Sequence, residues 1–184
     1  DRYDLDLQRN LVLDSKCGNV QVQQSVGLFR MNRAVQYPFF PVVDTFNSKD
    51  SVAGIIVNKL EQILPLFPSE IKIDTVRSEN VLYVSTLFTS SNNSGLMSSN
   101  FMLSPDPQQN PFLKLLGQSG KVLSALSSLK GGGELMLISD SKFLSDEGGM
   151  SIPDNMVFLM NAVDYLADDE DLISLRSREV TSRP

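Results

Sequence analysis

The sequence predicts a three-layer α/β domain, in which a mostly parallel or mixed sheet is flanked by helices. The prediction rests on the last third of the chain. An apolar run at 134–139 ends in polar residues, as a buried strand does, and residues 154–167 carry apolar side chains at helical spacing. A short strand pattern follows at 172–178. This order of strand, loop, helix and strand is typical of layered α/β domains.

Composition indicates a single globular domain spanning residues 1–184. The chain is long enough for one sizeable core, and its 41% hydrophobic and 21% charged residues fit a folded protein. A net charge of -6 argues against nucleic acid as a partner, because phosphate backbones need clustered Lys and Arg. No apolar run approaches the length of a membrane span, and no signal peptide is visible. Because the chain starts at Asp1 with no Met, we expect a fragment of a longer protein.

The chain lacks the residues that most side-chain catalysis requires. It has no histidine, which removes Ser-His-Asp and Cys-His catalysis and His-ligated zinc. Cys17 is the sole cysteine in the sequence, and we interpret it as a small filler or turn residue. We therefore expect no enzyme activity, no metal and no cofactor.

The first half of the chain predicts short strands and one helix. Apolar runs at 11–13 and 20–22 read as strands around a turn at 17–19, and the aromatic, proline-bearing segment 37–43 reads as an edge or extended segment that plugs the core. Apolar residues at helical spacing predict a helix over 52–64, capped by Asn47 or Ser48 and stopped by Pro65. Strands are expected at 71–75 and 81–88.

The second half predicts a loop at 89–100, a strand or helix start at 112–116, a helix-like stretch at 122–129 and a glycine turn at 131–133. The helix at 154–167 is expected to be capped by Asp154 or Ser151. Its apolar stripe is expected to lie on the sheet. We predict burial of Leu159, Val163 and Leu166 from this stripe, which also includes Ala162, and of Leu135, Leu137 and Val84 from the sheet.

Two motifs resemble functional patterns without their context. Residues 139–142 satisfy S-x-x-K, but the serine ends a strand and the S-D-N and K-T-G partners of that chemistry are missing. The acidic cluster at Asp164 and 168–171 lacks the alternating D-x-D-x-D-G pattern of a calcium loop. A solvated run of charges is the favoured interpretation of this cluster.

One position keeps a general argument for a ligand site. In open α/β sheets ligands lie beyond the carboxyl ends of the strands, which here would be residues 89–91 and 139–141. Ordinary turn chemistry is the favoured interpretation, and a small-ligand or glycan crevice is the alternative. The weak candidates for ligand binding are Ser90, Ser91, Ser139, Asp140, Ser141 and Asn155.

Five segments, in order, carry a resemblance to a known family. They are the aromatic segment 37–43, the turn and strand at 67–74, the strand end L-F-T-S-S at 87–91, residues 112–127, and the stretch S-D-S-K-F-L-S at 139–145 with Asn155, N-A-V-D-Y-L at 161–166 and 172–178. Together they resemble the extracytoplasmic domain of the GldG family, auxiliary proteins of ABC-type transporters of gliding bacteria. Ser139 stands where that family has glycine, and Leu126 where it has phenylalanine.

The resemblance implies a glutamine-amidotransferase-like or flavodoxin-like fold, related to a domain of intraflagellar transport proteins. It also implies a non-catalytic domain on the periplasmic side of the cytoplasmic membrane, held by anchors outside this chain. The implied partners are the permease and ATPase subunits of an ABC transporter. The sheet would be incomplete, because the family has a further βαβ portion before this point.

Overall fold

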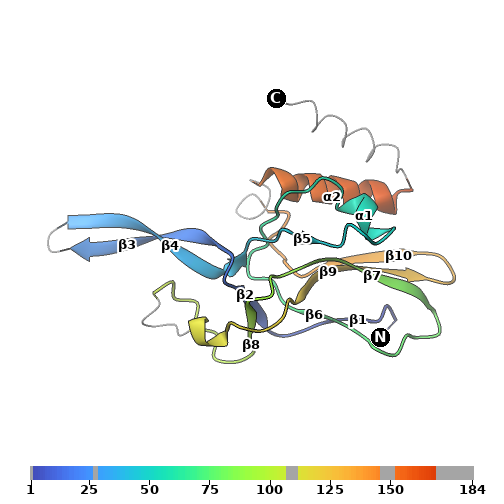
Figure 1. Ribbon diagram of the computed structural model, residues 1–184, viewed down its shortest axis with the longest axis horizontal. Helices are drawn as coiled ribbons and strands as arrows, with labels where there is room; N and C mark the ends of the chain where they lie inside the picture. The colour runs from blue at the N-terminus through green and yellow to red at the C-terminus, as the bar shows by residue number, and fades with distance from the viewer. Residues whose placement is uncertain (1, 27–28, 107–111, 146–151, 169–184) are drawn as a thin grey trace.

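The computed structural model describes residues 2–26, 29–106, 112–145 and 152–168. Within them the chain is mainly β-strand, arranged as one four-stranded sheet and three two-stranded sheets (Figure 1). Every strand pairing in the described residues is antiparallel. The prediction of a mostly parallel α/β sheet of the flavodoxin-like kind is therefore wrong.

The central sheet has the order β10 (Glu134–Ile138), β9 (Val122–Leu129), β7 (Val81–Thr89) and β5 (Thr45–Phe46). Strands β7 and β10 were predicted from sequence, but β9 was expected to be helical. Its apolar residues mimic helical spacing because both faces of the strand are buried, Leu126 in one core cluster and Ala125 in another. A strand covered on both faces shows no period of two.

Helix α2 (Pro153–Leu166) and the single turn α1 (Ala53–Ile56) cover one face of this sheet (Figure 1). The rings of Phe158 on α2 and Phe88 on β7 meet edge to face with centroids 5.3 Å apart. Phe143 packs on the other side of Phe158 at 5.9 Å. These three fully buried rings form the centre of the largest core cluster, since aromatic side chains bury the most area per residue.

The extent of α2 was predicted correctly, but its buried face was not. Val163 and Leu166 are 56% and 45% exposed, and Leu159 is only half-buried. The residues that face inward are Asn155, Phe158, Asn161 and Ala162. Asn161 turns inward because its side-chain amide donates to the carbonyl of Ile56 at 3.0 Å, which satisfies a buried polar group. On the sheet, Leu135 is 36% exposed rather than buried, and Val84 and Leu137 are half-buried.

The predicted helix over 52–64 is also wrong beyond its first turn. Lys59 has a positive φ of 57°, which takes the backbone out of the helical region. The chain then runs to Ile63, which exchanges two backbone hydrogen bonds of 2.9 Å with Val43. The start of α1 is held by Asp50, whose Oδ1 accepts from the N–H groups of Val52 and Ala53 at 2.9 Å, and not by Asn47 or Ser48.

The other face of the central sheet is covered by a small sheet of β1 (Leu5–Leu7) and β6 (Ile71–Ile73). Strand β6 lies within the predicted strand at 71–75. Leu5 and Ile71 pack with Ala125 of β9 in a cluster of their own. The central sheet is therefore the middle layer, with helices on one side and the two-stranded sheet of β1 and β6 on the other (Figure 1).

A second cluster lies where β2 (Leu11–Asp14) pairs with β8 (Ser94–Met97). Strand β8 falls inside the segment predicted to be a loop. A Cβ at Gly95 would clash with the carbonyl oxygen of Leu115, at the end of the 3-10 turn η1 (Phe112–Leu115), so glycine permits this close approach. Tyr37 and Phe39 are buried in the same cluster, which confirms that the aromatic segment plugs the core.

The longest strands, β3 (Cys17–Val26) and β4 (Phe29–Pro41), pair with each other and project from the rest of the molecule (Figure 1). We call this pair the β3–β4 ribbon. A bulge lies between Cys17 and Asn19, where the sequence predicted a turn. No helix among the described residues is both long and apolar enough to cross a membrane.

Candidate functional site

The ends of β7 and β10 lie at one edge of the central sheet. Both strands are antiparallel to β9, so they run in the same direction and finish on either side of its first residues. Ser90 donates its backbone N–H to the carbonyl of Lys121 at 2.9 Å, and Ser139 donates to that of Leu123 at 3.0 Å. The structure therefore brings Ser90 and Ser139 to the same edge, although the sheet is antiparallel.

The serines that follow β7 are engaged in the fold. The Oγ of Ser90 accepts the N–H of Lys121 at 2.7 Å. Ser91 donates its N–H and its hydroxyl to the two carboxylate oxygens of Asp14, both at 2.6 Å. Because Asp14 is fully buried at the end of β2, these bonds satisfy its charge and join β2 to β7. The hydroxyl oxygens of both serines are thus engaged within the fold.

Asp140 and Asn155 hold a neighbouring stretch of backbone. The Asp140 carboxylate accepts from the N–H of Leu66 at 2.8 Å and of Lys142 at 2.7 Å. The Asn155 amide accepts from the N–H of Leu64 at 2.9 Å and donates to its carbonyl at 3.1 Å. Asp154 does not cap α2 but accepts from the N–H groups of Glu61 and Gln62. Burial raises the pKa of Asp140, and the two N–H donors oppose that rise.

Ser139 and Ser141 differ from their neighbours. The Oγ of Ser139 is buried and has no hydrogen-bond partner among the described residues, so it forms no hydrogen bond to Lys142 of the S-x-x-K pattern. Ser141 is exposed. The predicted site residues therefore lie around one end of the sheet. Their polar atoms bond mainly to the backbone of Leu64, Leu66, Lys121 and Lys142 and join β2 to β7.

A metal site is not formed in the part of the chain that the structure describes. No group of three or more His, Cys, Asp or Glu residues there is placed to hold an ion. Of the acidic cluster, Asp164 and Asp168 lie in and just after α2, and residues 169–171 lie outside the described residues. Ser151, an expected cap of α2, also lies outside them.

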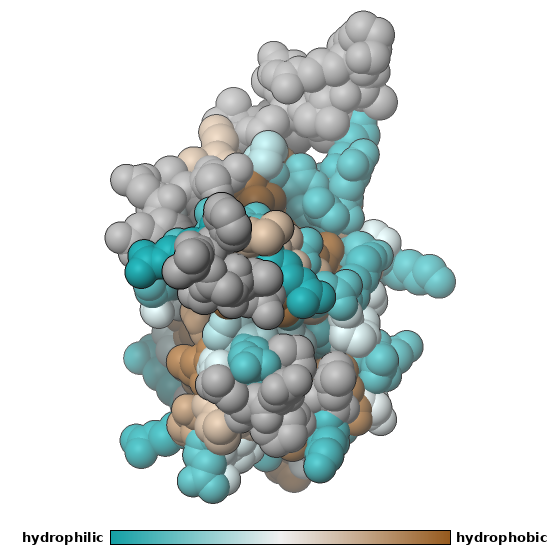
Figure 2. Space-filling view, turned by 90° about the vertical axis from the view of Figure 1, so that its left-hand side faces the viewer, coloured by the Kyte–Doolittle hydropathy of each residue, from teal (hydrophilic) through white to brown (hydrophobic). Residues whose placement is uncertain are grey.

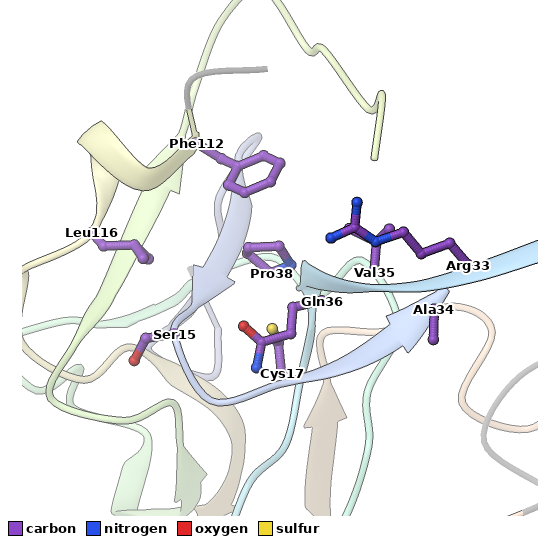
Figure 3. A pocket seen from close by; sticks show the side chains of 9 residues that line it. All are labelled: Ser15, Cys17, Arg33, Ala34, Val35, Gln36, Pro38, Phe112 and Leu116. Atoms are coloured by element: carbon purple, nitrogen blue, oxygen red, sulfur yellow. The ribbon is translucent and has the colours of Figure 1, made fainter. Parts of the chain in front are cut away.

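A pocket of about 460 Å³ opens at the root of the β3–β4 ribbon (Figure 3). Phe112 and Leu116 form one wall, and residues of β4 form the other. In Figure 3 the Arg33 side chain extends along the ribbon toward the side where Phe112 and Pro38 lie. The full lining is Ser15, Cys17, Arg33, Ala34, Val35, Gln36, Pro38, Phe112 and Leu116.

The chemistry of this pocket is apolar with one cationic group. Arg33 is its single charged lining residue, and Ser15 and Gln36 add neutral hydrogen-bonding groups. Burial raises the pKa of the Cys17 thiol, which keeps it protonated and a poor nucleophile. Sequence reasoning missed the pocket because its walls come from three separate segments and contain no motif. The available signal was Arg33 in a long stretch without acidic residues.

Comparison with known protein families gives a match over most of the chain. No characterised protein and no solved structure shows significant similarity to the chain. Residues 1–162 match the family described as ABC-type uncharacterized transport system, an ABC transporter auxiliary family. The match covers all four sheets, the β3–β4 ribbon and most of α2. The chain therefore belongs to this ABC transporter auxiliary family.

Proposed function

We propose that this domain is a non-catalytic part of an ABC-type transport system and works by binding other proteins. The observation that carries the proposal is the family match over residues 1–162. The hydrogen bonding of the strand ends supports it, since Ser90, Ser91, Asp140 and Asn155 stabilise the fold. Catalytic groups must instead be free to meet a substrate.

The finer proposal follows the GldG resemblance. The domain lies on the periplasmic side of the cytoplasmic membrane, is anchored by segments outside this chain, and associates with the permease and ATPase subunits of a transporter of the gliding-motility type. The surface offers places for such contacts. Strand β10 ends the central sheet and pairs with β9 alone among the described strands, so its other edge can accept a strand. Leu82 and Leu135 are exposed apolar residues on β7 and β10.

A second candidate function is ligand binding. The pocket at the ribbon root has a volume in the range of small-molecule sites, and Arg33 with Gln36 suits a small anionic ligand or the hydroxyls of a glycan. The crevice expected from sequence at Ser139 and Asp140 is the other location. Ligand-induced changes in NMR chemical shift would distinguish these two locations.

The test of the proposed function uses the full-length, membrane-anchored protein. It is purified from its native membrane under mild detergent, and the permease and ATPase encoded beside it are sought by mass spectrometry. We expect both subunits at near-equal amounts with the bait. Absence of both would overturn the proposal.

A hydrolase and ligand screen on the same protein tests the non-catalytic assignment. We expect no turnover. Turnover that is lost in Ser139→Ala or Asp140→Ala, and kept in the exposed control Ser141→Ala, would show that the domain is an enzyme.

A further inference from the structure

The outer part of the β3–β4 ribbon has no packing partner among the described residues. Strands β3 and β4 form a two-stranded sheet of their own, paired from Cys17 opposite Pro41 to Val26 opposite Phe29. The root of β4 packs into the second core cluster through Tyr37 and Phe39. Beyond that root, both strand edges keep unpaired backbone N–H and C=O groups, which form a ready template for another strand.

The two faces of the ribbon have different chemistry, because successive cross-strand pairs alternate between faces. One face carries polar amides in the pairs Asn19–Gln36 and Gln23–Asn32. The other face carries Val20–Val35 and Val22–Arg33, and then Met31, which is 59% exposed. On this face Val20 packs against the second core cluster and Val22 and Val35 are half-buried, whereas Met31 and Arg33 are exposed. Exposed apolar and cationic side chains beside an amide face are typical of a binding surface rather than of a solvated strand.

The charge of the ribbon is opposite to that of the whole chain. Residues 17–43 contain two arginines and no Asp or Glu, in a chain of net charge -6. Arg30 and Arg33 are exposed, and neither forms an ion pair with a described residue. By contrast Lys16, just outside the ribbon, is paired with Asp44. The two arginines are therefore available to an external carboxylate. Figure 2 looks onto this end of the molecule and shows hydrophilic side chains around apolar surface.

These features favour an acidic protein segment as the partner over anionic lipid and nucleic acid. Binding to anionic lipid takes clusters of about four to eight Lys or Arg, and a nucleic-acid backbone takes a basic patch or stripe. Two arginines are too few for either. Free strand edges, amide side chains and alternating apolar positions instead match the recognition of an extended peptide, in which main-chain hydrogen bonds give affinity and side-chain contacts give specificity.

We infer that the β3–β4 ribbon is a docking arm that binds an extended, acidic segment of another protein of the transport system. The segment adds as a strand to a ribbon edge and presents carboxylates on both of its faces, because Arg30 belongs to the amide face of the ribbon and Arg33 to the opposite face. Its apolar residues lie along Val22 and Met31. This inference rests on the proposed function and names the surface through which it acts.

The experiment places a photo-activated cross-linking amino acid at Gln21 or Gln23 of the full-length protein in its native cells. Asn58, which is exposed on the body of the molecule, serves as the control position. Cross-linked peptides are sequenced. The cross-linking is repeated in Arg30→Glu/Arg33→Glu and in a control with the same change of net charge, Lys72→Glu/Lys130→Glu, whose lysines are exposed elsewhere.

We expect cross-links from the ribbon positions to map to a segment rich in Asp and Glu in a subunit of the transporter. The yield should fall at least tenfold in the arginine double variant and stay unchanged in the lysine control, because only the ribbon charges face the segment. Replacing the acidic residues of the cross-linked segment by Lys should restore the yield in the arginine double variant. Circular dichroism should show both double variants folded.

Three outcomes would overturn the inference: cross-links to lipid, to a second copy of this chain, or to a segment whose yield does not respond to the arginine variant. If the ribbon gives no cross-link while the permease and ATPase still co-purify, the proposed function stands and the docking arm fails. If neither subunit co-purifies and no cross-link forms, both fail.

Discussion

The body around the central sheet and the β3–β4 ribbon use their polar residues in opposite ways. In the body, Asp14, Asp140 and Asn155 are buried and their polar atoms bind backbone or neighbouring side chains. On the ribbon, Arg30 and Arg33 are exposed without an ion pair to any described residue. The residues that resemble a site in the sequence thus stabilise the fold, whereas the segment without a motif keeps its binding groups free. Exposed charged groups without an ion-pair partner are a better guide to a binding surface than polar residues alone.

The largest expected effect tests whether the body is centred on its aromatic rings. Phe158→Ala should lower the free energy of unfolding by about 3–5 kcal/mol, because it removes a fully buried ring between Phe88 and Phe143. Val163→Ala, at an exposed position of the same helix, should change it by less than about 0.5 kcal/mol. Urea unfolding measures both. A larger effect for Val163 would mean that the opposite face of α2 is the buried one.

The next effect tests whether Asn155 is structural. Asn155→Ala should cost about 1–3 kcal/mol, because it leaves the N–H and C=O of Leu64 without their partner. Asn92→Ala, which removes an exposed amide, should cost less than about 0.5 kcal/mol. Thermal and urea unfolding give these values. An Asn155 variant as stable as the wild type would show that this residue is not structural and would make it a candidate site residue.

A pH series tests the buried carboxyl of Asp140. Its pKa is raised in the folded state, so its stabilising contribution is complete below the unfolded-state pKa and falls as the pH rises through the folded-state pKa. Asp140→Asn removes this dependence. We therefore expect the loss of stability in this variant to be larger near pH 3 than near pH 7. Urea unfolding of both proteins across this range checks the sign. A loss that grows toward neutral pH would mean that the folded state favours the carboxylate.

The smallest expected effect is on the ribbon. The double variant Gln23→Ala/Asn32→Ala removes a facing pair of exposed amides and should change stability by less than about 0.5 kcal/mol. Differential scanning calorimetry would detect a larger change. A loss of more than about 1 kcal/mol in the free energy of unfolding lies beyond the usual range for surface positions. It would show that the ribbon amides stabilise the fold, as the polar residues of the body do.

Local patterns predicted several elements well. Strands at 81–88 and 134–139 and the helix at 154–167 appear as β7, β10 and α2 within one or two residues. The burial of Tyr37 and Phe39 also followed from the sequence. These segments have strong punctuation or a single dominant pattern, which is why their limits were predictable.

The rest depended on tertiary contacts. Strand β9 mimics a helix because Leu126 and Ala125 are buried on opposite faces, and the inward face of α2 includes Asn161, which no hydrophobic pattern selects. The position of Ser90 and Ser139 at the same end of the sheet was predicted, because both follow the carboxyl end of a strand. The hydrogen bonds that engage the serines after β7 were not, because Asp14 and Lys121 lie far away in sequence. The pocket at the ribbon root likewise needed three distant segments.

The hydrogen bonds that Asp140, Asp154 and Asn155 accept from the backbone of residues 61–66 have a consequence for hydrogen exchange. Four amide protons, those of Glu61, Gln62, Leu64 and Leu66, bond to side chains 74 to 93 positions later in the chain. These amides can be protected only after the start of α2 and the end of β10 have docked. They therefore report long-range docking, and native-state exchange at the three that α2 contacts should rise in unison whenever α2 detaches.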